Sequence, residues 1–425
     1  MAQLSTSKEL LQFELPDIIL SRRAIFNVQK DVVAYELQID GKDELSANER
    51  EESNTAELLL QLIDNGLQSC VDNLTAFIPI SKSYVKAGLP LIENVNNVVF
   101  EIPDGLLQQG EKQRFFALVK RPDLRFAWVH PKPDSLDSEM LKWVSFVKLD
   151  VSNSTPTGFR SLLEYYRSNG IKTIADQVSS PSMFEFCKEL GFDFFMGYFF
   201  CMPSIVDQKQ VPASKISVLQ LICELQNPEV TFERVQEIVE KDVSLSYRIL
   251  RYINSPVFQF PKKIDSIKNA ILIAGLNTIK TLSVIVAHSK IVDKPPELFK
   301  IALMRARMCD TLAKQRQMEC DSAFLLGLFS TLDALTDMRM SDICSRLPLS
   351  DDIRNILVNY TSADTIPECQ LLNAVVRFEQ GNWASFSADT DNSYELHDMR
   401  DHYWNAVNWV SDVLSQLCGP QLSKI

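Results

Sequence analysis

The chain has 425 residues, of which 46% are hydrophobic and 23% are charged, and its formal net charge is −12. This composition is that of a globular protein, and the length corresponds to two or three domains. The acidic balance argues against broad binding to nucleic acid or to anionic lipid, because phosphate groups repel such a surface.

Nine cysteines are scattered between Cys70 and Cys418 and form no CxxC pair. The first residues lack a basic segment followed by an apolar run, so no secretory signal is expected. The most apolar stretch, residues 270–287, is interrupted by polar side chains, whereas a membrane span needs about 20 predominantly apolar residues. We therefore expect a cytoplasmic protein with reduced thiols and no membrane partner.

The first half alternates predicted strands with predicted helices. Apolar or β-branched runs predict eight strands at residues 18–28, 32–39, 74–80, 98–102, 125–129, 146–151, 171–178 and 192–200. Helical patterns occupy residues 55–70, 156–169 and 181–190, and Gly191 is expected to end the last of them. This interleaving predicts an α/β barrel. Residues 27–31 are too few for a crossover helix, so the first two strands should pair antiparallel.

The second half, from about residue 212, loses the strand pattern and becomes helical. Val218, Leu221, Ile222 and Leu225 fall at i, i+3, i+4 and i+7, which marks one face of a helix. We expect helix N-caps at Thr231, Ser244, Ser266 and Asn277, a helix end near Gly275 and a loop at residues 381–393. The change of pattern at residues 202–214 predicts two domains, 1–205 and 206–425.

The first half carries a series of short motifs. In chain order they are Leu20-Ser21-Arg22, Tyr35-Glu36-Leu37, Phe100-Glu101-Ile102, Lys148-Leu149-Asp150, Ala175-Asp176, Gly191-Phe192-Asp193 and Gly197-Tyr198-Phe199-Phe200. These motifs resemble those of the EAL family, bacterial enzymes that hydrolyse cyclic di-GMP, and the resemblance covers about residues 16–205. It implies a modified TIM-like barrel whose strand ends hold two magnesium or manganese ions, which activate water for attack on a phosphodiester.

The resemblance also assigns roles to four polar residues. Glu36 and Glu101 take the places of ligand glutamates, and Lys148 takes the place of the lysine that contacts the attacking water. Asp176 falls where a glutamate normally stands.

Five other family positions have lost their chemistry. Pro79 replaces a ligand asparagine, and Val129 and His130 replace the paired aspartates that hold and bridge the metals. Asp40 replaces an arginine that contacts a ligand phosphate, and Met196 replaces a glutamine that binds guanine. The surviving carboxylates are too few to enclose two magnesium ions, so we expect no active catalytic site, no bound metal and no cofactor. Binding of cyclic di-GMP is not favoured.

Several alternatives remain for the survivors. Glu36 and Lys148 could simply form a salt bridge that fastens the top of the barrel, with His130 filling the emptied site. A transition-metal site of His130 with Glu36 and Glu101 is a second reading. In a third, Asp134 and Asp137 of the following loop replace the lost metal ligands.

The second half resembles the HDOD family, an all-helical output domain of bacterial signalling proteins. The matching residues are Asp242-Val243-Ser244-Leu245, the run 250–255, Ile267, Ala270-Ile271 and Gly275. The matching core spans about residues 212–291, with a helical extension to the C-terminus. HDOD domains lack the histidine–aspartate metal ligands of the related HD phosphohydrolases. His397-Asp398 and His402 resemble a metal pair only loosely, and an exposed polar helix start is favoured there.

A helix-turn-helix at residues 266–290 is a rival interpretation. Its second helix would have to expose polar side chains to DNA bases, but it carries Ile279, Leu282, Val284, Ile285 and Val286. A buried helix is therefore expected, and no nucleic-acid partner.

Together these features predict a non-catalytic signalling regulator or scaffold linked to cyclic-di-GMP pathways. It would act through protein partners that the sequence does not name, and a homodimer stays open. The alternatives are a metal-dependent EAL-type phosphodiesterase and a cyclic-di-GMP sensor without hydrolysis.

Overall fold

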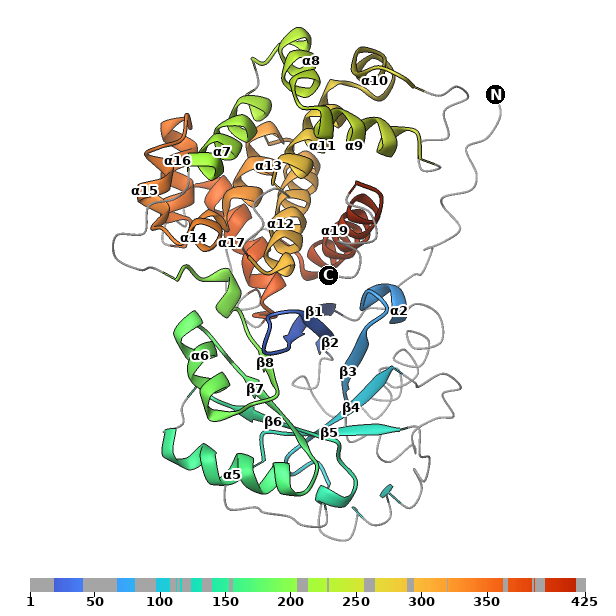
Figure 1. The fold of residues 1–425 in the computed structure, drawn as a ribbon, viewed down its shortest axis with the longest axis vertical. Coiled ribbons are helices and arrows are strands. Elements are labelled where there is room, and N and C mark those ends of the chain that lie inside the picture. Colours follow the sequence, from blue (N-terminus) through green and yellow to red (C-terminus); the bar gives the residue numbers. More distant parts are fainter. Residues whose placement is uncertain are drawn as a thin grey trace.

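A closed barrel of eight strands forms the N-terminal half of the described chain (Figure 1). The structure is a computed structural model that describes residues 19–40, 67–80, 97–107, 112, 115–116, 124–131, 140–152, 156–204, 213–227, 229–255, 264–288, 294–318, 320–361, 366–383, 386 and 394–417. The strands are β1 (Ile19–Phe26), β2 (Val32–Asp40), β3 (Thr75–Pro79), β4 (Val98–Pro103), β5 (Arg125–Val129), β6 (Phe146–Asp150), β7 (Lys172–Asp176) and β8 (Phe194–Met196). The predicted barrel is confirmed.

Strand β1 is antiparallel to both of its neighbours, β2 and β8, while the other pairs are parallel. A tight turn joins β1 to β2, because the Asn27 side-chain oxygen accepts hydrogen bonds from the backbone N–H groups of Gln29 and Asp31. Lys30 adopts a left-handed conformation in the same turn (φ 68°). The antiparallel start expected from the short gap is therefore confirmed.

The described helices of the barrel half are short or lie on its outer side. They are α2 (Leu67–Cys70), η1 (Met140–Lys142), α5 (Pro156–Ser168), α6 (Pro181–Leu190) and η2 (Phe199–Cys201). Helix α6 begins after the N-cap Ser180. It ends at Gly191, and this end was predicted. Residues 55–66 of the expected earlier helix lie outside the described residues.

The last predicted strand, residues 192–200, is wrong in length, because β8 ends at Met196. Gly197 has φ 141°, and a β-carbon there would lie 2.2 Å from the carbonyl oxygen of Val178. The chain therefore leaves the sheet at Gly197, and the apolar residues that follow form η2.

The C-terminal half of the described chain is helical. Its helices are α7 (Ala213–Gln226), α8 (Phe232–Lys241), α9 (Val243–Ile253), α10 (Ile267–Ala274), α11 (Leu276–His288), α12 (Pro296–Gln315), α13 (Cys320–Phe329), α14 (Leu332–Thr336), α15 (Met340–Cys344), α16 (Asp351–Asn359), α17 (Pro367–Glu379) and α19 (Leu396–Leu417). None of the described helices is long and apolar enough to cross a bilayer. The cysteines whose side chains are described form no disulfide with one another.

Two of the four predicted helix caps are wrong. Thr231 and Ser266 cap α8 and α10 as expected. Asp242, not Ser244, caps α9, because its carboxylate accepts from the backbone N–H of Leu245 at 3.0 Å. Helix α11 begins at Leu276, so Asn277 lies inside it rather than at its cap.

Helix α12 is central to the helical half and packs against α13, α17 and α19. It meets α13 at Gly327, where a β-carbon would lie 2.4 Å from the carbonyl oxygen of Arg305. The helical half packs on the β1 side of the barrel through α17 and α19 (Figure 1).

The substitution Gly327→Ala tests this close approach. Alanine normally stabilises a helix interior by about 1 kcal/mol relative to glycine. Here the new methyl group meets the α12 backbone, so we expect the free energy of unfolding to fall by about 1–3 kcal/mol, measured by urea denaturation. A gain in stability would contradict the packing. Ser244→Ala, at an exposed site in α9, serves as the control.

Candidate functional site

Five charged side chains form one layer inside the mouth of the barrel. They are Arg23 of β1, Glu36 of β2, Glu101 of β4, Lys148 of β6 and Asp176 of β7. The layer beneath them in the barrel interior is apolar and consists of Ile25, Ala34, Phe77, Val99, Ala127, Ile174 and Met196. Every second side chain of a strand points into the barrel, so inward-pointing residues two positions apart lie in successive layers.

Lys148 links the two surviving glutamates. Its ammonium group donates to Glu36 Oε1 and lies 2.7 Å from Glu101 Oε1. All three residues are at most 5% exposed, so no water screens these charges. The predicted salt bridge between Glu36 and Lys148 is confirmed.

Arg23 is a second cation in the mouth, and it is not among the site residues predicted from the sequence. Its Nε donates to Glu36 Oε2 at 2.7 Å, and its Nη2 lies 2.5 Å from the same oxygen. Its Nη1 is 3.7 Å from Asp176 Oδ1. The signal was the register: Arg23 stands opposite Glu36 once β1 and β2 pair through their short turn.

The pKa values of this layer follow from burial and from the two cations. Burial alone would raise the pKa of Glu36, but Lys148 and Arg23 lower it to about 2. Burial raises the pKa of Glu101 to about 7, since Lys148 only partly opposes it and the charge of Glu36 adds to it. Burial would lower the pKa of Lys148, but Glu101 and Glu36 raise it above its ordinary value. Glu101 is thus the acid of this group that exchanges its proton near neutrality.

His130 lies against Asp176, with Nε2 2.9 Å from Oδ2. It adopts a left-handed conformation (φ 50°), and its backbone N–H donates to the carbonyl of Lys148. The other Asp176 oxygen, Oδ1, accepts from the backbone N–H of Gln177. Among the described residues no group of three or more His, Cys, Asp or Glu could hold a metal ion.

The positions expected to have lost their ligands lie around the same mouth. Pro79 pairs with Glu101 at the end of β3, and Val129 pairs with Lys148. Met196 is fully buried and belongs to the apolar layer beneath the charged one. Asp40 is the last residue of β2, but its side chain is outside the described part, as are Asp134 and Asp137.

In the helical half, two alternatives from the sequence remain: a metal pair of His397-Asp398 with His402, and a DNA-binding helix-turn-helix. His402 contacts α12 through both ring nitrogens, with Thr311 Oγ1 at 2.8 Å and Gln315 Oε1 at 2.7 Å. Asp398 is exposed, and the His397 side chain lies outside the described part. The apolar side chains of helix α11 are buried, as expected. A DNA-reading helix would need exposed polar side chains at these positions.

Replacing Glu101 by glutamine should remove a pH-dependent cost. Its pKa in the folded protein, about 7, exceeds the ordinary 4.5, so its contribution to stability is fully present below pH 4.5 and is lost as the pH rises through 7. Relative to Glu101→Gln, the wild type should therefore lose about 1–3 kcal/mol of unfolding free energy between about pH 5 and pH 8.

Urea denaturation at a series of pH values measures this difference. Glu164→Gln, at an exposed site on α5, should run parallel to the wild type. Parallel curves for Glu101→Gln would instead show that burial of Glu101 carries no such cost.

Comparison with known proteins adds a family match and two relatives. Residues 211–345 match the model of the HDOD domain, which extends beyond the core expected at 212–291. The "Uncharacterized protein YuxH" of Bacillus subtilis (strain 168) is 26% identical over 410 residues, 93% of this chain and 99% of that protein. The "Cyclic di-GMP phosphodiesterase CdgJ" of Vibrio cholerae is 27% identical over 417 residues, 93% of this chain and 92% of that protein.

Solved structures of EAL proteins are also similar to part of the chain. An EAL domain protein from Listeria monocytogenes EGD-e is 15% identical with a TM-score of 0.34, covering 43% of this chain and 87% of that one. A standalone EAL protein from Vibrio cholerae O395, in its c-di-GMP bound form, is 16% identical with a TM-score of 0.34, covering 43% and 91%. The chain therefore carries an HDOD domain at residues 211–345, downstream of a closed eight-stranded barrel with EAL-type motifs along its strands.

Proposed function

We propose that this protein is a non-hydrolytic regulator in a cyclic-di-GMP signalling pathway, which acts through contacts with protein partners. The observation that carries the proposal is the donor set of the mouth: Pro79 and Val129 present no side-chain oxygen, and the cations Arg23 and Lys148 contact the carboxylates that remain. The place in the pathway follows from the EAL-type motifs, the HDOD domain and the name of the relative CdgJ.

The donor set does not fit two divalent cations. Magnesium requires about six oxygen ligands per ion in near-octahedral geometry. The described mouth offers the carboxylates of Glu36, Glu101 and Asp176, while Pro79 and Val129 present no side-chain oxygen. Each of the three carboxylates already contacts another charged or polar side chain: Lys148 lies against both glutamates, Arg23 against Glu36 and Asp176, and His130 against Asp176.

The balance of charges in the mouth also argues against a bound divalent cation. With Glu101 protonated, the charges of Arg23 and Lys148 balance those of Glu36 and Asp176. A divalent cation about 4 Å from Lys148 would be repelled by about 8 kcal/mol at an effective dielectric constant of about 20. This repulsion opposes the attraction of the carboxylates, which are too few here to hold two ions.

The second candidate function is metal-dependent hydrolysis of cyclic di-GMP. The name of CdgJ favours it, because that relative matches this chain over 93% of its length. In this case the missing ligands would come from Asp134 and Asp137, which lie outside the described residues. The two functions differ in whether the purified protein turns over the nucleotide.

A turnover assay with the purified full-length protein, cyclic di-GMP and Mn²⁺ separates them. We expect no hydrolysis above a protein-free blank, because the carboxylates are held by side-chain cations. Hydrolysis that is abolished in Glu36→Ala and retained in Glu164→Ala, an exposed substitution on α5, would refute the proposal. Comparing these two single variants separates the activity of this protein from that of a contaminating enzyme.

Titration calorimetry tests the sensor alternative. Asp40 and Met196 stand where the family places its phosphate and guanine contacts, so we expect no saturable heat with cyclic di-GMP at concentrations up to about 1 mM, the weak limit of specific binding. A saturable signal that disappears in Arg23→Met would instead establish a nucleotide site at the mouth.

A further inference from the structure

Strand β1 faces two different environments through consecutive residues. Neighbouring side chains on a strand point to opposite faces, so Arg22 and Arg23 must diverge. Arg23 lies in the mouth against Glu36. Arg22 lies on the outer face of the barrel, where the helical half packs, and it is only 7% exposed.

Arg22 is held by groups of the barrel wall. Its Nη1 donates to the carbonyl oxygen of Cys70 at 2.7 Å and lies 3.3 Å from Asp72 Oδ1. Its guanidinium group also stacks over the ring of Tyr35, 4.3 Å from the ring centroid. Such a buried planar cation has one well-defined position.

Helix α12 completes this network from the other half of the chain. The hydroxyl of Tyr35 donates to Glu297 Oε2 at 2.9 Å, and Lys300 Nζ lies 3.0 Å from Asp72 Oδ2. Two of the three groups that hold Arg22, Tyr35 and Asp72, are therefore tied to α12 by polar contacts.

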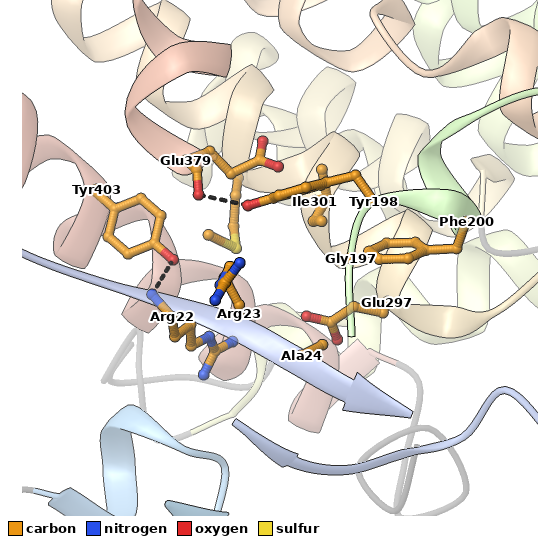
Figure 2. Close-up of a pocket in the computed structure, with 11 residues that line it drawn as sticks. Arg22, Arg23, Ala24, Gly197, Tyr198, Phe200, Glu297, Ile301, Glu379 and Tyr403 are labelled. Carbon is orange, nitrogen blue, oxygen red and sulfur yellow. Dashed lines mark hydrogen bonds between the residues drawn. The ribbon is translucent and has the colours of Figure 1, made fainter. Parts of the chain in front are cut away.

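Helix α19 also binds the backbone of β1 directly. Strand β8 pairs with β1 only at Ile25 and Phe26, so no described strand pairs with the first part of that edge. Tyr403 and Trp404 take its place: the Arg22 N–H donates to the Tyr403 hydroxyl at 3.2 Å (Figure 2), and Trp404 Nε1 donates to the carbonyl of Leu20 at 3.1 Å.

Helix α17 reaches the rim of the mouth. The hydroxyl of Tyr198, just after β8, donates to the carbonyl oxygen of Glu379 at 2.7 Å (Figure 2). Gly381 follows with φ 70°, and a β-carbon there would lie 2.2 Å from Gln38 Oε1 of β2. Gln38 in turn accepts from Ser21 Oγ of β1.

We propose that docking of the helical half controls the barrel mouth through β1. The mouth is called closed when Arg23 contacts Glu36 and Asp176, and it stays closed only while the helical half is docked. When α12 and α19 hold the first part of β1, Arg23 stays on Glu36 and Asp176. When they move away, the Leu20 carbonyl and the Arg22 N–H lose their partners, this part of β1 loosens, and Arg23 leaves the carboxylates. The inference rests on the proposed function only in taking Arg23 as part of the closed mouth.

Hydrogen exchange of the full-length protein, read by mass spectrometry, tests this coupling. The double variant Tyr403→Phe with Trp404→Phe keeps the aromatic packing but removes both hydrogen bonds to β1. We expect about tenfold faster amide exchange not only in β1 but also in the parts of β2 and β7 that carry Glu36 and Asp176.

The matched control is Trp383→Phe. It removes an indole hydrogen bond of the same length, 3.1 Å, to the carbonyl of Phe378 within the helical half. We expect its faster exchange to stay near α17. Faster exchange at β2 and β7 in this control as well would reduce the effect to general destabilisation and overturn the proposal.

Unchanged protection of β2 and β7 in the double variant, with faster exchange in α19, would also overturn it. Should the double variant fail to fold, Trp404→Phe alone gives the same comparison with its control. Exchange is measured without nucleotide, so its outcome is independent of the turnover assay: hydrolysis would end the proposed function and leave this result intact.

Discussion

The charges in the barrel mouth must balance, because burial removes the water that would otherwise screen them. Glu36, Glu101 and Asp176 are each at most 5% exposed, and such acids need either cations or protons. Lys148 and Arg23 supply the cations, and the raised pKa of Glu101 lets it keep a proton near neutrality. The shape of the mouth, the role of β1 and the proposed function all depend on this balance.

Polar side chains of the barrel half and of the helical half contact one another directly. Arg22, Tyr35 and Asp72 of the barrel meet Glu297 and Lys300 of α12 in a buried network. Isolated buried ion pairs often contribute little stability, but they require a particular arrangement of their partners. This network therefore defines how the halves dock. Both relatives match this chain across 93% of its length, a share that includes residues of both halves.

Features that depend on short stretches of the sequence could be predicted. The strand order, the antiparallel start and the pairing of Glu36 with Lys148 follow from alternation, gap length and motif order. The helix ends at Gly191 and Gly275 follow from residues that tolerate unusual backbone angles.

Features that depend on distant parts of the chain could not. The role of Arg23 needs the β1–β2 register, and the early end of β8 needs the close approach of Gly197 to Val178. Asp242 and Ser244 are both good cap residues, and only the position of α9 decides between them. The partners of Arg22 lie up to 381 residues away along the chain.

The short β8 has a consequence for synthesis on the ribosome. The open part of β1 leaves the ribosome well before its hydrogen-bonding partners Tyr403 and Trp404, which lie in the last described helix. Domains ordinarily fold as they leave the ribosome, N-terminal domain first. Here the Arg22 N–H gains its partner only after a further 381 residues have been made, and until then the nascent chain carries an exposed strand edge.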